Sequence, residues 1–151
     1  MLDRLRSAVF QRHVLDAEIH ALEWCRSTGA PWHTAQEHVG GHAGSSSPVE
    51  RAAEDGAALD ALIDSDRAKL SELDETIGRG LHVLEVLRDE LGGGYADTCE
   101  AYYVDGPERE WMGAGRVTWA EVAERLGISE RLAYLRRDVA IDWIDWRFSK
   151  T

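Results

Sequence analysis

The sequence predicts an all-α fold, because apolar residues recur at helical spacing along most of the chain and strand-like alternation is lacking. Steps of three and four residues separate these apolar positions, and glycine, proline or serine stands where each periodic stretch stops. We therefore expect a long antiparallel helical hairpin of coiled-coil type, followed by a C-terminal helix-turn-helix.

The first expected helix occupies the start of the chain. Its apolar stripe consists of Leu5, Ala8, Leu15, Ile19 and Leu22. Gly29 and Pro31 follow, and both residue types end helices. A loop rich in Gly, Ser and His is expected over residues 28–46.

A second, longer helix is expected to begin near Ser47, which would cap it, and to end at the glycines of residues 92–94. Gly78 and Gly80 fall inside it, so the pattern allows a break or kink there. Two narrow stripes joined by a loop predict a hairpin over residues 1–91. Because such a seam makes a poor enzyme pocket, the hairpin is interpreted as an oligomerisation arm, and the chain as a homodimer.

A second domain is expected over residues 95–151. It begins with a short helical segment, YADTCEAYYV, which a turn-rich stretch, DGPEREWMGAG, follows. Two helices then run from Trp119 to Leu126 and from Glu130 to about Phe148.

The junction between these last two helices has a specific pattern. Thr118 and Glu121 have the spacing of a capping box, and Ser129 is placed to cap the final helix. Gly127 supplies the positive φ that ends the first helix of the pair, and Ile128 is apolar because the turn folds inward. A small residue, a glycine, an apolar residue and a cap in this order predict a helix-turn-helix.

The final helix is expected to present one face to the core and another to DNA. The predicted inward stripe is Leu132, Leu135, Val139, Trp143 and Trp146. The candidate DNA-binding residues are Ser129, Glu130, Arg131, Tyr134, Arg136 and Arg137. Arginine can bind guanine bidentately or bind phosphate, and tyrosine can stack or bind phosphate. A solvated, salt-bridged helix face is the alternative.

The charge of the chain restricts its nucleic-acid binding. A formal net charge of -11 argues against unspecific binding along a phosphate backbone. The sign reverses within residues 124–137, where Arg125, Arg131, Arg136 and Arg137 face only two glutamates. A local basic contact is therefore expected at the start of the final helix.

Catalytic and metal chemistry finds little support. His38 and His42 have ligand spacing on a helix, but Gly40 and Gly41 stand between them, so a polar loop is favoured over a metal site. No phosphate-binding loop and no nucleophilic triad is recognisable. We expect no enzyme activity, no metal and no cofactor.

The compartment is predicted from cysteine usage and hydropathy. Cys25 and Cys99 lie far apart, so both are expected to be free, buried thiols. No apolar run approaches the roughly 20 residues that cross a bilayer, and the first residues lack the apolar core of an export signal. The expected location is the cytoplasm, without membrane contact.

The C-terminal motifs resemble a known family. YYVDG at residues 102–106, then TWAEVAERLGIS and AYLRRDVAIDWI, are similar to the C-terminal part of phage-encoded transcription regulators of the RinA/ArpU type. Their helix-turn-helix is similar to region 4 of sigma factors. Here the stretch 107–115 lengthens the link to the capping threonine. The resemblance implies a phage or prophage regulator that binds double-stranded promoter DNA, with host RNA polymerase as a further partner.

Two other functions fit the same pattern. A phage DNA-packaging protein similar to the terminase small subunit also joins a helix-turn-helix to a helical oligomerisation region. An acidic helical adaptor would bind a partner protein and contact DNA weakly.

Overall fold

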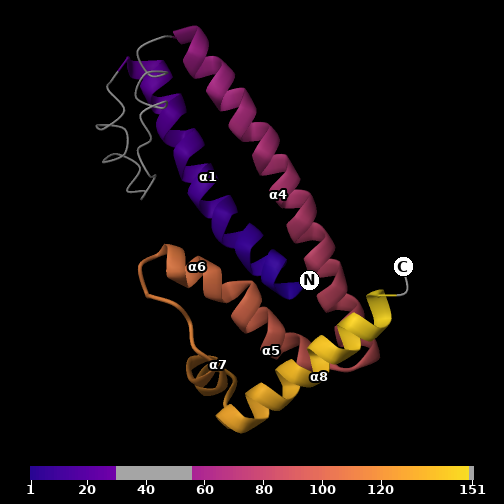
Figure 1. The fold of residues 1–151 in the computed structure, drawn as a ribbon. Coiled ribbons are helices and arrows are strands. Elements are labelled where there is room, and N and C mark those ends of the chain that lie inside the picture. The colour runs from indigo at the N-terminus through magenta and orange to yellow at the C-terminus, as the bar shows by residue number, and fades with distance from the viewer. Residues whose placement is uncertain (30–55, 150–151) are drawn as a thin grey trace. The chain divides into compact units, whose positions relative to one another are not determined.

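A computed structural model describes residues 1–29 and 56–149, and these residues form helices without any strand (Figure 1). The helices are α1 (Leu2–Thr28), α4 (Gly56–Glu90), α5 (Gly93–Tyr103), α6 (Asp105–Trp111), α7 (Trp119–Leu126) and α8 (Glu130–Phe148). The all-α prediction is confirmed. The expected loop over 30–46 and the helix start near Ser47 lie outside the described residues. In the described ranges, no helix is long and apolar enough to cross a membrane.

The chain divides into two units, and α1 and α4 each contribute to both. The first unit comprises residues 1–10 and 75–151, and the second comprises residues 11–74. Each has its own buried apolar cluster.

In the second unit, the segments of α1 and α4 run antiparallel. Arg12 pairs with Asp74 at 2.8 Å, and further along α1 Arg26 pairs with Asp60 at 3.0 Å, so the order of partners is reversed. The buried cluster consists of Ala21, Leu22, Cys25, Leu59 and Ile63. Of these side chains, Leu22 belongs to the apolar stripe expected for the first helix, whereas Ala21 and Cys25 do not.

The helix α4 continues without a break through Gly78 and Gly80. The two glycines have different surroundings. A Cβ at Gly80 would lie 2.7 Å from Cδ1 of Leu5, whereas a Cβ at Gly78 would meet nothing within 4 Å. Gly80 is therefore required for the close approach of α1 to α4 in the first unit. The break or kink that the sequence allowed at these glycines does not occur.

The core of the first unit is assembled from the start of α1, the end of α4 and the helices that follow. α8 packs against both α5 and α7, and α5 also packs against α6 and α7 (Figure 1). The most deeply buried side chains include Leu5, Leu87, Cys99, Val122 and Ile144. Cys25 and Cys99 are both buried free thiols, as expected. Burial raises the pKa of the Cys99 thiol to about 12, so this group is neutral.

The stretch predicted as turn-rich is partly helical, which corrects the sequence interpretation. Residues 105–111 form α6, with Gly106 and Pro107 both buried in its first turn. Proline is tolerated there because the first N–H groups of a helix have no partner within it. A Cβ at Gly106 would lie 3.1 Å from Nη1 of Arg6, so the glycine also permits a close contact.

The inward face of α8 also differs from the prediction. Leu135 and Trp146 are 57% and 59% exposed, whereas Ala133, Ala140 and Ile144 are buried. The packing of α8 against α5 and α7 places small side chains at the contact, because two helices approach closely only where no large side chain separates them. The predicted stripe was therefore wrong at Leu135 and Trp146.

Candidate functional site

The first side of the candidate site is the start of α7. The backbone N–H of Thr118 donates to Oε2 of Glu121 at 2.7 Å, and the backbone N–H of Glu121 donates to Oγ1 of Thr118 at 3.3 Å. These reciprocal bonds form the capping box that the sequence predicts. The carboxylate of Glu121 also accepts a bond from the Thr118 hydroxyl at 3.0 Å, and the bonds from the backbone N–H and then the hydroxyl of Thr118 lower the pKa of Glu121.

The turn between α7 and α8 is fixed by its own backbone bonds. Gly127 has φ 64° and ψ 32°, the left-handed conformation that glycine adopts without steric cost. The N–H of Ile128 donates to the carbonyl of Ala123 at 3.0 Å, and the N–H of Gly127 donates to the carbonyl of Glu124 at 3.1 Å. This pair of bonds is a Schellman motif, and it determines the direction in which α8 leaves the turn.

The first turn of α8 is capped and open to solvent. Oγ of Ser129 accepts a hydrogen bond from the N–H of Leu132 at 3.2 Å. Glu130 and Arg131 are exposed, and Tyr134 is 38% exposed. Arg131 has no ion-pair partner among the described residues. Of the predicted site residues, these four share the exposed beginning of the helix.

The structure places Arg136 and Arg137 differently. Arg136 is half-buried, and a Cβ at Gly94 would lie 3.0 Å from its Cζ, so its guanidinium group lies against the start of α5. Arg137 forms an ion pair with Asp138 at 2.6 Å. Its guanidinium group also lies 4.8 Å from the ring centroid of Tyr134. The side chain of Arg137 therefore contacts Tyr134, whereas that of Arg136 contacts the start of α5.

Arg137 belongs to a larger cluster that we call the aromatic–arginine stack. Its members are Arg6, Tyr102, Trp119, Tyr134 and Arg137. The rings of Tyr102 and Trp119 are stacked, with centroids 4.1 Å apart and planes 12° apart. The guanidinium group of Arg6 lies 4.3 Å from the Tyr102 ring, and that of Arg137 lies 5.4 Å from the Trp119 ring. The stack joins α1, α5, α7 and α8 in the first unit, and it supports α8 through cation–π contacts.

Sequence reasoning missed the role of Arg6. Arg6 forms a hydrogen bond to the carbonyl of Tyr102 and an ion pair with Glu110, and both partners lie far along the chain. Oε1 of Glu110 also accepts a bond from the N–H of Val117 at 3.0 Å. The segment that leads into α7 is thus fixed by a half-buried ion pair. No local pattern around Arg6 indicates this role.

Two further arginines lie before α7. Arg109 and Arg116 are exposed, and neither has an ion-pair partner in the described part of the chain. Arg116 stands two residues before the N-cap of α7, where helix N–H groups and their dipole attract anions. Its position next to the predicted cap Thr118 is the feature of the sequence that could have identified Arg116 as a candidate site residue.

The basic character of the site is limited. Arg125 on α7 pairs with Asp105 at 2.7 Å, and Arg137 pairs with its neighbour Asp138. Of the four arginines within residues 124–137, only Arg131 is both exposed and without a described partner. The cationic surface at the start of α8 is therefore small.

The histidine-rich stretch that was weighed as a metal site lies outside the described residues. No family model, no curated protein and no solved structure matches this chain.

Proposed function

We propose that this protein is a DNA-binding transcription regulator that inserts the start of α8 into the major groove of promoter DNA. The supporting observation is the exposed, Ser129-capped first turn of α8, where Arg131 has no ion-pair partner within residues 1–29 and 56–149 and Tyr134 lies one turn further on. In this proposal α7 and α8 form a helix-turn-helix similar to sigma region 4, with α8 as the recognition helix.

The chemistry of this turn suits base and phosphate contacts. A major groove about 12 Å wide admits one helix, and side chains near the N-terminus of that helix reach the base edges. Arg131 can bind O6 and N7 of guanine through its two parallel N–H donors. Tyr134 can donate its hydroxyl to a phosphate oxygen while its ring stays against Arg137.

The other predicted contacts take different roles. Arg137 would reach a phosphate by exchanging its exposed pairing with Asp138, a kind of interaction that contributes about 0–1 kcal/mol to stability. Arg116 would contact a phosphate near the start of α7. Arg136 is assigned to packing against Gly94 and not to DNA.

The wider proposal concerns the biological setting. The resemblance to phage regulators of the RinA/ArpU type favours a cytoplasmic phage or prophage protein, with host RNA polymerase as a further partner. Residues 1–91 would form the helical hairpin through which two copies associate. A mass of one protomer at tens of micromolar would contradict the dimer, and a large ring would favour the packaging alternative.

The direct test is binding to duplexes selected from a random pool. Arg131→Ala should weaken binding to the selected site by about 1–3 kcal/mol, the scale of one lost bidentate or phosphate contact. The matched control is Arg26→Ala, which removes the same charge from an exposed residue of the second unit. If Arg131→Ala and the parent chain bound the selected duplex with equal affinity, the start of α8 would not be part of the DNA interface.

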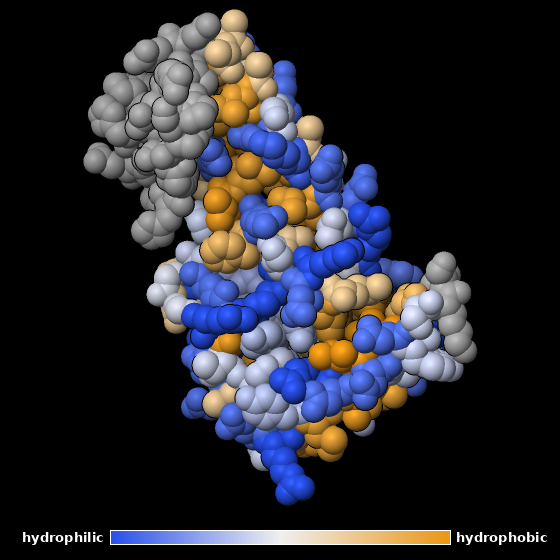
Figure 2. Space-filling model, in the orientation of Figure 1, coloured by the Kyte–Doolittle hydropathy of each residue, from blue (hydrophilic) through white to orange (hydrophobic). Residues whose placement is uncertain are grey.

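The adaptor function is supported by a different observation. Leu135 and Trp146 are exposed on α8, and Figure 2 shows hydrophobic surface along this part of the molecule. An adaptor would retain a partner protein and would leave every selected duplex unbound, even at low salt. Sequence-specific binding of a duplex that is weakened by Arg131→Ala would contradict the adaptor function.

A further inference from the structure

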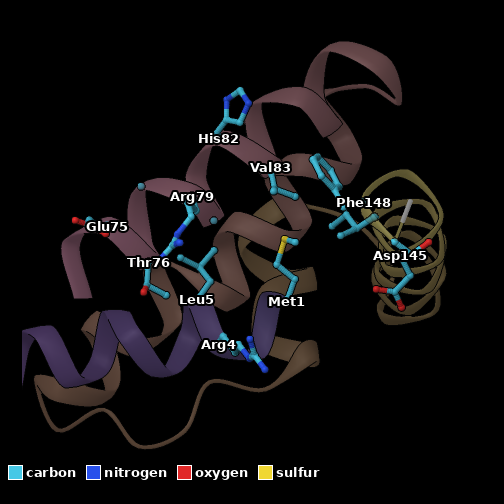
Figure 3. Close-up of a pocket in the computed structure, with 14 residues that line it drawn as sticks. Met1, Arg4, Leu5, Glu75, Thr76, Arg79, His82, Val83, Asp145 and Phe148 are labelled. Atoms are coloured by element: carbon cyan, nitrogen blue, oxygen red, sulfur yellow. The ribbon is translucent and has the colours of Figure 1, made fainter. Parts of the chain in front are cut away.

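A groove of about 1200 Å³ lies in the first unit, apart from the exposed turn of α8. It is lined by the first residues of α1, by α4 and by the end of α8 (Figure 3). Its apolar lining consists of Met1, Leu5, Val83, Ile144 and Phe148. The volume lies a little above the roughly 300–1,000 Å³ of most small-molecule sites, and the groove shares with them an apolar lining and a few polar groups.

Two arginines that line this groove have no counter-ion among the described residues. Arg4 and Arg79 are exposed, and neither forms an ion pair with any residue that the structure describes. In Figure 3 the side chain of Glu75, one turn before Arg79 on α4, points away from it. The chain has a net charge of -11, and most arginines of α1 and α4 pair with carboxylates. Two guanidinium groups beside an apolar surface, with no ion-pair partner in the described part of the chain, therefore favour an anionic ligand.

The wall of the groove contains a glycine that the fold does not require. Gly78 lines the groove, has helical backbone geometry, and would place a Cβ in open space. Glycine is the least favourable residue in a helix interior apart from proline, so its presence weakens α4 without a packing reason. A glycine at such a position allows a ligand to approach the helix backbone.

The charges give the groove a direction. In Figure 3, Arg4 and Arg79 lie on one side, whereas Asp145 lies on the other side beside Phe148. The carboxylate of Asp145 disfavours an anion at its own end, and in Figure 3 the side chain of Val83 lies between the two ends, while that of Leu5 lies between Arg4 and Arg79.

We propose that this groove binds a single-chain amphiphile with an anionic head, of the fatty-acid class. The head group accepts hydrogen bonds from Arg4 and Arg79, and the hydrocarbon chain lies over Leu5, Val83 and Gly78 toward Phe148. This binding is independent of the proposed contact with DNA, because none of the lining residues belongs to the exposed turn of α8.

The test is calorimetric titration of the full chain with laurate, at concentrations below those that form micelles. One saturable site is expected. Arg79→Ala should weaken binding about tenfold, as the loss of one charge-assisted contact predicts. Gly78→Leu should abolish binding, because its side chain occupies the groove, while the higher helix propensity of leucine preserves α4.

Two control variants separate the groove from general effects. Ala68→Leu adds the same side chain as Gly78→Leu at an exposed position of α4 in the second unit, and Arg109→Ala removes a charge outside the groove. Both should bind laurate like the parent chain. Dodecyl phosphate should also bind, and its affinity relative to laurate reports whether the head-group site prefers a carboxylate or a phosphate.

Three results would overturn the proposal. The first is that dodecyltrimethylammonium or dodecyl maltoside binds with the same affinity as laurate. The second is that Gly78→Leu binds laurate with the affinity of the parent chain. In the third result laurate would not bind, and Gly78→Leu would convert an associated form into protomers in sedimentation. That result would assign the groove to a second copy of the chain. The DNA-binding assay on the same variants reports independently on the other function.

Discussion

Arg131, Arg136 and Arg137 are neighbours on one helix but have three different surroundings. Arg131 is exposed without a described partner, Arg136 lies against Gly94, and Arg137 is held by Tyr134, Trp119 and Asp138. At the scale of single residues, the sequence identifies which side chains carry positive charge. It does not show which of them are available, because Gly94 and Trp119 reach α8 only through the tertiary fold.

Glu121 illustrates a residue whose role is local and was therefore predictable. Its pKa is lowered by the hydrogen bonds from Thr118, so the ionised carboxylate is more stable in the folded chain than in the unfolded chain. This contribution to stability is present at neutral pH and is lost as the pH falls through the folded pKa, below the ordinary value of 4.5. Glu121→Ala should therefore lower the free energy of unfolding at pH 7 and have a smaller effect at pH 3.

Urea unfolding at the two pH values measures this difference. Glu124→Ala is the matched control, because Glu124 is an exposed carboxylate on α7 outside the capping box. An equal loss of stability for Glu121→Ala at both pH values would show that the capping bonds do not depend on the charge.

At the scale of whole helices, the sequence predicted features that depend on local chemistry and missed those that depend on partners. The Thr118 cap, the Gly127 turn and the Ser129 cap are all present, since each involves only residues within one turn. The inward face of α8 was predicted from its largest apolar residues. The actual contact uses Ala133 and Ala140, because α5 and α7 approach closely there, and no periodicity of large residues reveals such an approach.

The two glycines within α4 give a prediction for this helix. Gly78→Ala should raise the free energy of unfolding by about 0.5–1 kcal/mol, because alanine favours the helix and its Cβ meets no atom. Gly80→Ala should lower it by about 1–3 kcal/mol, because the new Cβ would overlap the buried side chain of Leu5.

The pair of variants is its own control, since both make the same substitution two residues apart on one helix. Thermal or urea unfolding of the two proteins gives the comparison. Stabilisation by Gly80→Ala would contradict the close approach of α1 and α4 in the first unit, and destabilisation by Gly78→Ala would show that the groove side of α4 is constrained in another way.

At the scale of the whole molecule, charge restricts the DNA contact that we propose. The net charge of -11 opposes the approach of the phosphate backbone, and several arginines are already paired with carboxylates. Arg116, Arg131 and Arg137 are the cations that the proposed interface offers to phosphates and bases. Affinity must therefore come from a few positioned contacts and not from a broad basic surface.

This small number of contacts predicts a shallow dependence of DNA affinity on salt. The two phosphate contacts of Arg116 and Arg137 for each protomer correspond to a slope of about −2 in a plot of log K against log salt concentration, because each contact releases nearly one counter-ion. Titrations of a selected duplex between low and physiological salt measure the slope, and sedimentation of the complex gives the number of protomers. Arg116→Ala should reduce the slope by about 1 per protomer and should weaken all duplexes equally, whereas Arg131→Ala should also relax base preference. A slope more than twice as steep for each protomer would require cations beyond these three, and the DNA surface would then extend outside the start of α7 and α8.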